Sequence, residues 1–299
     1  MKNPNFFIVG APKCGTTALS TYLENHPNIF MSRPKEPHFF ADDFTAHRLI
    51  KTHEDYSRLF SKAGKEHLAV GEASVWYLYS STAARNIYHF DKNARIIVML
   101  RNPVDLVHSL HSQLLYSFYE DEPDFGKAWS LQPVRREGLS IPKYCREPAF
   151  LQYGEVGSLG HQLEHLFEVF PKDQVKAVLF DDLAASTQTI YCDILAFLGM
   201  PPDGKKEFPP VNRNKIRRID WIGRLHQRLP FRLIHIEYVV NKWFGTQLGI
   251  LEMIRALNAR RISRNPLPED YRSELRDYFQ EDIRKLSIIL HRDLVHWLD

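Results

Sequence analysis

Short apolar runs alternate along this chain with segments whose apolar residues recur at helical spacing. The runs predict strands at Phe6–Val9, His67–Val70, Arg95–Leu100 and Val175–Phe180. The segments between them predict helices, of which Thr187–Leu198 is the clearest because Gly199 and Pro201 follow it. Strands that alternate with helices are typical of βαβ units, so the pattern predicts an α/β fold with a central parallel sheet flanked by helices.

The rest of the sequence predicts loops and a closing helix. Residues 120–150 are rich in proline and charge and predict a long surface excursion, and residues 201–216 predict another loop. From Pro268 onward the apolar residues recur at helical spacing and predict an amphipathic helix over the last thirty residues. We predict one domain over residues 1–299, with the core sheet in about 5–200 and a capping or substrate-facing region over 201–299.

Composition narrows the class of protein. Of the 299 residues, 44% are hydrophobic and 25% are charged, which is ordinary for a soluble globular protein. The net charge of +3 is too small to predict nucleic-acid binding. Three widely spaced cysteines and the absence of a signal-peptide pattern predict a reduced, cytoplasmic protein. The 14 histidines are scattered without a metal-binding motif, so we predict no bound metal.

The segment between the first predicted strand and the first predicted helix carries the strongest chemical signal. It reads Gly10-Ala11-Pro12-Lys13-Cys14-Gly15-Thr16-Thr17. A helix N-terminus offers unpaired backbone N–H groups at the positive end of the helix dipole, and such groups bind anions such as phosphate. The glycine spacing matches the phosphate loop of nucleotide-binding enzymes, but the lysine lies inside the loop, at Lys13, instead of after the second glycine.

A second candidate anion site follows the strand Arg95–Leu100. A nucleoside triphosphatase would carry a metal-binding aspartate near the end of this strand, whereas this chain continues with Arg101-Asn102-Pro103. Asn102 can cap the next helix and Pro103 can begin it, which brings Ser109 toward the sheet edge of Arg101. Two anion sites without a metal suit a nucleotide with phosphates at both its 5′ and 3′ positions.

These two motifs resemble those of sulfotransferases that use 3′-phosphoadenosine 5′-phosphosulfate (PAPS). Residues 11–17 are similar to the 5′-phosphosulfate loop of that family, and Arg101-Asn102-Pro103 with Ser109 is similar to its 3′-phosphate motif. Lys35-Glu36-Pro37-His38-Phe39-Phe40 resembles a substrate-side segment of the carbohydrate (heparan-type) branch. Phe180–Leu183 and Arg292–Trp297 also resemble family elements, and the resemblance weakens over 110–150 and 218–265.

The resemblance implies a P-loop-like fold and in-line transfer of a sulfuryl group from PAPS to an acceptor hydroxyl or amine, with 3′,5′-ADP as the product. It implies nucleotide contacts from Lys13, Cys14, Gly15, Thr16, Thr17, Arg101, Ser109, Asn212, Lys215 and Arg217. Lys13 is expected to offset the charge that develops on the leaving nucleotide. Glu36 is the expected base that deprotonates the acceptor, whereas His38 either holds Glu36, contacts the substrate or itself acts as the base.

Several interpretations stay open from the sequence. Ala73 stands where the heparan-type enzymes carry a second active-site lysine, and Glu72 is either structural or substrate-facing. Trp76 and Tyr77 fit either stacking on a ligand or core packing. Residues 217–261 interleave arginines with apolar residues, which fits an acceptor groove, a helix at a membrane surface or a helix packed on the sheet. The predicted acceptor is a carbohydrate, a lipid such as a glycolipid or a small hydroxylated metabolite.

Two other functions are consistent with the first loop. One is a P-loop kinase that uses ATP and Mg²⁺, although the displaced lysine and the presence of Arg101 argue against it. The other is a catalytically inactive protein of the same fold that binds a nucleotide or a lipid. The presence of Lys13, Thr17 and Arg101 favours an active transferase over this second alternative.

Overall fold

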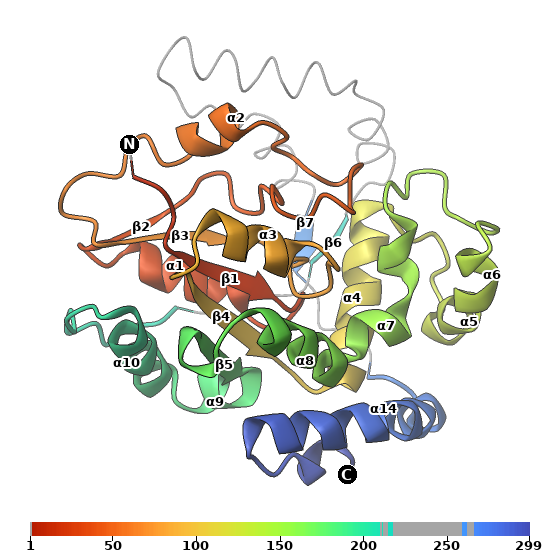
Figure 1. Cartoon of the computed structure of the whole chain (residues 1–299). Coiled ribbons are helices and arrows are strands. Elements are labelled where there is room, and N and C mark those ends of the chain that lie inside the picture. Colours follow the sequence, from red (N-terminus) through yellow and green to blue (C-terminus); the bar gives the residue numbers. More distant parts are fainter. Residues whose placement is uncertain (1, 210, 212–214, 218–258, 262–265) are drawn as a thin grey trace. The chain divides into compact units, whose positions relative to one another are not determined.

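The structure is a computed structural model that describes residues 2–209, 211, 215–217, 259–261 and 266–299 (Figure 1). In chain order its elements are β1 (Phe6–Gly10), α1 (Thr16–Glu24), β2 (Ile29–Met31), α2 (His53–Arg58), β3 (Ala69–Ala73), α3 (Ala83–Phe90), β4 (Arg95–Leu100), α4 (Pro103–Ser117), α5 (Phe125–Ser130), α6 (Gln132–Arg136), η1 (Pro148–Leu151), α7 (Tyr153–Gly157), α8 (Leu159–Val169), η2 (Lys172–Gln174), β5 (Val175–Leu179), α9 (Phe180–Ala185), α10 (Thr187–Leu198), β6 (Lys215–Arg217), β7 (Ala259–Arg261), α14 (Glu269–Leu290) and η3 (Val295–Trp297).

The chain divides into two compact units. The first consists of Met1–Leu110, Arg146–Asn212 and Leu267–Asp299, and the second consists of His111–Cys145 and Arg213–Pro266. The single domain expected from the sequence stays a prediction. Among the described residues, none of the helices has the length and apolar character that a membrane crossing needs.

A five-stranded parallel sheet forms the centre of the first unit, with the strand order β2-β3-β1-β4-β5 (Figure 1). All residues of β1 and β3 are buried, as expected for parallel strands that helices cover on both faces. Helix α1 packs against β1, β2 and β3, and α8 contacts both α3 and α14. The predicted α/β fold with a parallel sheet flanked by helices is therefore confirmed.

Three of the predicted strands lie where the apolar runs placed them. Strand β4 matches the prediction, β1 is one residue longer and β5 ends at Leu179 because Phe180 begins α9. The fourth prediction, His67–Val70, is correct in the presence of a strand but wrong in its bounds, because β3 begins at Ala69 and continues to Ala73. Leu68 is 59% exposed and His67 accepts the backbone N–H of Gly64 in a turn, so neither residue belongs to the sheet.

The segment 120–150 is more regular than predicted, because it contains α5, α6 and the start of η1. Part of its charge is internal to the fold. Glu120 and Arg135 form a bidentate ion pair with both N–O distances at 2.6 Å, and neither side chain is exposed. The high content of charged residues therefore did not indicate a surface loop throughout this segment, because two of the charged side chains are buried in an ion pair.

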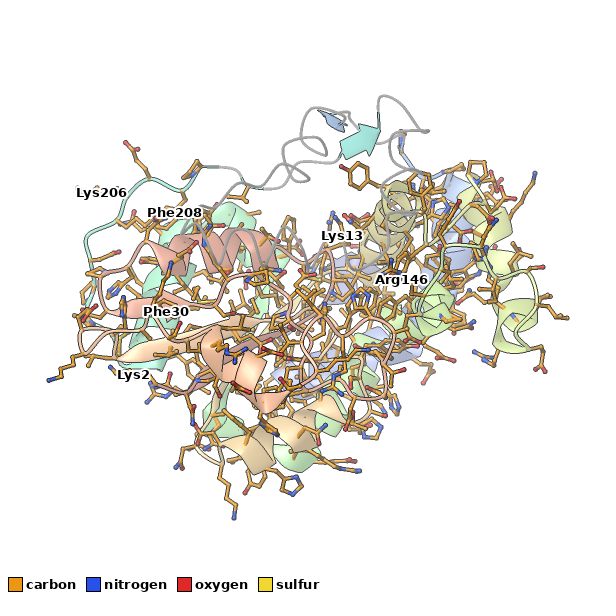
Figure 2. The ribbon with its side chains drawn as sticks, turned by 90° about the horizontal axis from the view of Figure 1, so that it is seen from above. Lys2, Lys13, Phe30, Arg146, Lys206 and Phe208 are labelled. Carbon is orange, nitrogen blue, oxygen red and sulfur yellow. The ribbon has the colours of Figure 1, made fainter. Side chains whose placement is uncertain are left out.

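The C-terminal helix and the second predicted loop also differ from the expectation at their ends. Helix α14 begins after Pro268 as predicted but ends at Leu290, because His291 adopts a left-handed conformation with φ of 50°. Residues 201–209 are irregular as predicted, whereas 215–217 form β6, which pairs antiparallel with β7. Phe208 lies over α1 (Figure 2), where its ring centroid is 5.1 Å from that of Tyr22.

Candidate active site

The loop between β1 and α1 adopts a conformation suited to binding an anion. Lys13 and Gly15 both have positive φ, 64° and 87°. A Cβ on Gly15 would lie 3.2 Å from the Phe180 ring, so both the backbone and the space favour glycine there. The N–H of Ala11 donates to the Met99 carbonyl of β4 at 2.7 Å, which fixes the loop to the central strands. The N-terminus of α1 therefore lies at the carboxyl ends of β1 and β4, with Lys13 beside it (Figure 2).

The side chains of this loop differ in their surroundings. Thr16 is buried and Thr17 is half-buried in the first turn of α1. Cys14 is fully buried, and its Sγ lies 3.4 Å from the Pro12 carbonyl. Burial raises the pKa of the Cys14 thiol to about 12, despite the nearby charges of Arg101 and Lys13. The Cys14 side chain therefore packs inside the loop. Cys14 can contact a phosphate through its backbone.

Arg101 joins the two predicted anion sites. Its Nη1 donates to the carbonyl oxygen of Lys13 at 3.4 Å, and its Cζ lies 4.7 Å from the centroid of the Phe180 ring. Its Nη2 is 3.7 Å from Asp105, which also accepts a hydrogen bond from Arg272 at 3.2 Å. The Arg101 side chain is only 22% exposed. An oriented and partly desolvated cation therefore lies directly beside the first loop.

The C-terminal segment is bonded to the turn that follows Arg101. The side-chain amide of Asn102 caps α4 and donates to the Trp297 carbonyl at 3.1 Å. The Trp297 Nε1 donates in turn to Asp181 at 2.8 Å. The two segments that the sequence singled out separately, Phe180–Leu183 and Arg292–Trp297, are therefore connected to each other and to the second anion site.

The other predicted nucleotide contacts are less well defined. Ser109 is buried on α4, downstream of Arg101. Asn212 lies outside the described residues, and of Lys215 and Arg217 the structure describes only the backbone, in β6. All four contacts stay predictions. The membrane-surface or acceptor-groove interpretation of 217–261 also falls on a stretch of which only 217 and 259–261 are described.

Glu36 and His38 lie together beside the end of β3. Both have positive φ, 65° and 52°, and the Glu36 N–H donates to the carbonyl of Ala73 at 3.0 Å. The Oε1 of Glu36 is 2.5 Å from the Lys35 Nζ, and its Oε2 is 3.7 Å from the His38 Nε2. Burial opposes ionisation, but Lys35 and His38 outweigh it and hold the pKa of Glu36 well below its usual range. Glu36 is therefore a carboxylate at neutral pH, the form that a base requires.

The His38 ring is buried beside Glu36 and His47. The side chain of His38 is 3% exposed, and neither Nδ1 nor Nε2 has a hydrogen-bond partner among the residues that the structure describes. The His47 ring lies 4.6 Å away between centroids, and burial together with His38 lowers the pKa of His47 to about 3. A buried polar group without a partner costs about 1–3 kcal/mol, so the His38 ring is a candidate for contact with a ligand.

Glu72 faces hydroxyl groups and not the solvent. It is fully buried, with Oε2 accepting from Tyr56 at 2.6 Å and from Tyr77 at 3.2 Å, and Oε1 accepting from Ser74 at 2.5 Å. Burial raises the pKa of Glu72 to about 7 even though the three hydroxyls favour its ionised form. Of the two interpretations left open by the sequence, the structural one is the correct one for this side chain.

The aromatic residues after β3 belong to the core. Trp76 stacks on Phe150 with a centroid distance of 3.6 Å and an interplanar angle of 3°. Trp76 and Tyr77 are both buried. Of the two interpretations that the sequence left open for these rings, core packing is therefore the correct one.

We expect Glu72→Gln to remove a pH dependence of stability. Because the folded-state pKa of about 7 lies above the usual 4.5, the unfolded chain releases this proton at lower pH than the folded chain. The wild-type free energy of unfolding should therefore fall as pH rises from 4.5 to 7, by up to a few kcal/mol. Urea denaturation of both proteins across this range measures the difference. The exposed Glu207→Gln is the matched control, and a pH-independent difference between Glu72→Gln and wild type would contradict the prediction.

No group of three or more histidine, cysteine, aspartate or glutamate residues that could hold a metal ion occurs in the part of the chain that the structure describes. Whether sulfuryl transfer proceeds without a metal ion is a different question, and metal-independent transfer stays a prediction.

The sequence matches the family model of the sulfotransferase domain over residues 3–216. The chain belongs to the sulfotransferase family. Among solved structures, the crystal structure of a sulfotransferase from Alicyclobacillus acidocaldarius is similar over 100% of both chains, with a TM-score of 0.72 and 27% sequence identity. The predicted family and its fold are therefore confirmed, and membership implies PAPS as the sulfuryl donor.

Curated relatives include carbohydrate-modifying enzymes. Human carbohydrate sulfotransferase 15 is 26% identical over 258 residues, which cover 68% of this chain and 45% of the relative. The mouse bifunctional heparan sulfate N-deacetylase/N-sulfotransferase 3 is 26% identical over 315 residues, which cover 99% of this chain and 31% of the relative. The chain thus spans less than half the length of these curated relatives.

Proposed function

We propose that this protein transfers a sulfuryl group from PAPS to a hydroxyl or amine of a carbohydrate, a glycolipid or a small hydroxylated metabolite. The observation that carries the proposal is the hydrogen bond from Arg101 to the Lys13 carbonyl, which places a second cationic site beside the first anion-binding loop. A nucleotide with phosphates at both its 5′ and 3′ positions would use both sites. PAPS and its product 3′,5′-ADP are such nucleotides.

The 5′ end of the donor is assigned to the first loop. Backbone N–H groups at the start of α1 and the hydroxyls of Thr16 and Thr17 bind the phosphosulfate. The ammonium group of Lys13 offsets the negative charge that grows on the bridging oxygen as the sulfur–oxygen bond breaks. The 3′-phosphate is assigned to Arg101 and Ser109, and Asn212, Lys215 and Arg217 are proposed to complete the nucleotide site.

The acceptor is assigned to the side of Glu36 and His38. The acceptor oxygen or nitrogen attacks the sulfur atom, and its proton passes to the Glu36 carboxylate. His38 holds or assists Glu36, because its Nε2 lies 3.7 Å from the Glu36 Oε2. The names of the two curated relatives, a carbohydrate sulfotransferase and a heparan sulfate sulfotransferase, support a sugar as the acceptor.

The test of donor recognition compares 3′,5′-ADP with 5′-AMP by isothermal titration calorimetry. Arg101→Ala should weaken 3′,5′-ADP binding by about 10- to 100-fold, the range for a lost hydrogen bond to a charged group. It should weaken 5′-AMP binding much less, because that nucleotide loses only the support that Arg101 gives to the loop. Arg276→Ala, which removes the same charge on α14, is the control and should change neither affinity. Equal wild-type affinities for the two nucleotides would overturn the proposed 3′-phosphate site.

The test of activity measures transfer of ³⁵S from PAPS to a panel of N-desulfated heparin, chondroitin, a glycolipid and p-nitrophenol. Labelled product from any of these acceptors supports the proposal, and mass spectrometry then locates the sulfate. Tight 3′,5′-ADP binding without transfer to any acceptor favours the inactive alternative. Mg²⁺-dependent turnover of ATP would instead favour the kinase.

A further inference from the structure

We propose that Glu72 is a positioning residue that orients the segment carrying Glu36 and His38 through two hydroxyl groups. This inference rests on the proposed roles of Glu36 and His38 as the groups that face the acceptor. Glu72 is fully buried in β3 and is not itself assigned a contact with the substrate. Its effect on the reaction would be indirect, through the backbone of residues 36–40.

The first connection runs through Ser74. Its hydroxyl donates to Glu72 Oε1 at 2.5 Å and accepts the backbone N–H of His38 at 3.1 Å. A serine hydroxyl has one hydrogen and two lone pairs. Because the short bond to Glu72 uses that hydrogen, the lone pairs are left to accept the N–H of His38. The carboxyl group therefore determines which way the Ser74 hydroxyl points.

The second connection runs through Tyr77. Its hydroxyl donates to Glu72 Oε2 at 3.2 Å and accepts the backbone N–H of Phe40, also at 3.2 Å. The two oxygens of one carboxyl group thus hold two backbone N–H groups that are two residues apart. The Glu36 N–H is bonded to the carbonyl of Ala73, the residue after Glu72. The segment is therefore held at residues 36, 38 and 40 by groups on or beside β3.

This support matters because the segment is not stable by its own conformation. Glu36 and His38 are non-glycine residues with positive φ, a region that such residues adopt only when the surrounding structure enforces it. Within the described ranges, the His38 ring makes no hydrogen bond that could orient it independently. The Lys35–Glu36 ion pair and the packing of the His38 ring on His47 help to orient the two side chains, but their positions depend on the backbone that carries them. A displacement of about 1 Å at a reacting group can cost about 10²-fold in rate.

Tyr56 provides a matched control within the same network. Its hydroxyl donates to the same Glu72 Oε2 at 2.6 Å, and Tyr56 is as buried as Tyr77. In the described part of the chain this hydroxyl connects to no backbone N–H of residues 36–40. Its ring stacks on Phe39 at a centroid distance of 4.4 Å, and Tyr56→Phe keeps that ring. The substitution removes a bond to Glu72 without removing a bond to the segment.

The experiment compares Ser74→Ala, Tyr77→Phe and Tyr56→Phe in the full chain. We expect the first two variants to lower kcat for ³⁵S transfer from PAPS to N-desulfated heparin by about 10- to 100-fold. Their affinity for 3′,5′-ADP should stay within about twofold of wild type, because the nucleotide loop is built by other residues. Hydrogen–deuterium exchange of the peptide covering residues 36–40 should be faster in both. Tyr56→Phe should lose a comparable amount of thermal stability, yet keep kcat and exchange close to wild type.

The outcomes separate this inference from the proposed function. If Tyr56→Phe lowers kcat and speeds exchange as much as the other two variants, or if all three keep wild-type kcat, Glu72 is structural only and the inference is wrong. If Glu36→Gln retains full activity, the proposed base is wrong whatever the three variants show. If the wild type sulfates no acceptor, the proposed function fails, and the exchange comparison still decides whether Ser74 and Tyr77, and not Tyr56, hold the segment.

Discussion

Replacing Lys13 by alanine is expected to slow sulfuryl transfer by about 10²- to 10³-fold, the effect of removing one preorganised charge-stabilising group. The ammonium group is proposed to act on the bridging oxygen, whose negative charge is larger in the transition state than in bound PAPS. The affinity for 3′,5′-ADP should fall much less, because the backbone N–H groups and Arg101 remain. The Arg101 contact in particular survives, since it is made to the Lys13 carbonyl.

Single-turnover transfer of ³⁵S from PAPS, with nucleotide affinity measured in parallel, separates these two effects. Lys13→Met, which keeps the length of the side chain, should behave like alanine, whereas Lys13→Arg should retain part of the rate because it keeps the charge. The exposed Lys62→Ala is a control for the loss of one positive charge. Near-normal turnover by Lys13→Ala with nucleotide still bound would rule out the proposed role at the leaving group.

Glu36→Gln is expected to lower kcat by about 10²- to 10⁴-fold, the usual contribution of a general base. The amide keeps the shape of the side chain but cannot accept the acceptor's proton. Since Lys35 and His38 hold the pKa of Glu36 well below its usual range, the active carboxylate is present at neutral pH and is lost only when pH falls through that depressed pKa. The wild-type rate should therefore not fall between pH 7 and pH 5 through protonation of Glu36.

A pH–rate profile of wild type and Lys35→Met tests the second part of this prediction. Removing the ammonium group 2.5 Å from Glu36 should raise the pKa of the carboxyl and move the acid limb of the profile to higher pH. His38→Gln separates the two candidate bases. A variant pair in which Glu36→Gln is active and His38→Gln is inactive would assign the base to His38.

The arrangement of the two candidate anion-binding motifs could be predicted from sequence because the signals are local. A glycine-bracketed loop between a strand and a helix fixes the backbone geometry within a few residues. Parallel strands also bring their carboxyl ends to one edge, so two motifs about ninety residues apart in sequence could be expected to meet. The hydrogen bond between Arg101 and the Lys13 carbonyl shows that they do.

The acceptor side could be predicted only in part. Glu36 and His38 are proposed from a family resemblance, but no sequence pattern singles out His47 or Tyr56. A loop and helix α2 bring these two residues close through tertiary packing. Glu72 interrupts the apolar pattern of β3, and this is one reason why the predicted strand ended too early. A carboxyl group inside a buried strand is tolerated here because three hydroxyls contact it. The partners that make this possible cannot be read from a periodic pattern.

We expect the contact between Arg101 and the loop to link the two ends of the bound nucleotide energetically. The guanidinium group that would bind the 3′-phosphate is the same group that steadies the backbone carrying the Lys13 side chain. Coupling of this kind is reciprocal. Occupation of the 3′-phosphate site changes the binding free energy at the 5′ loop by the same amount as occupation of the 5′ loop changes it at the 3′-phosphate site. A donor without its 3′-phosphate would consequently be disfavoured twice, first in its affinity and then in the placement of the ammonium group beside the bond that breaks.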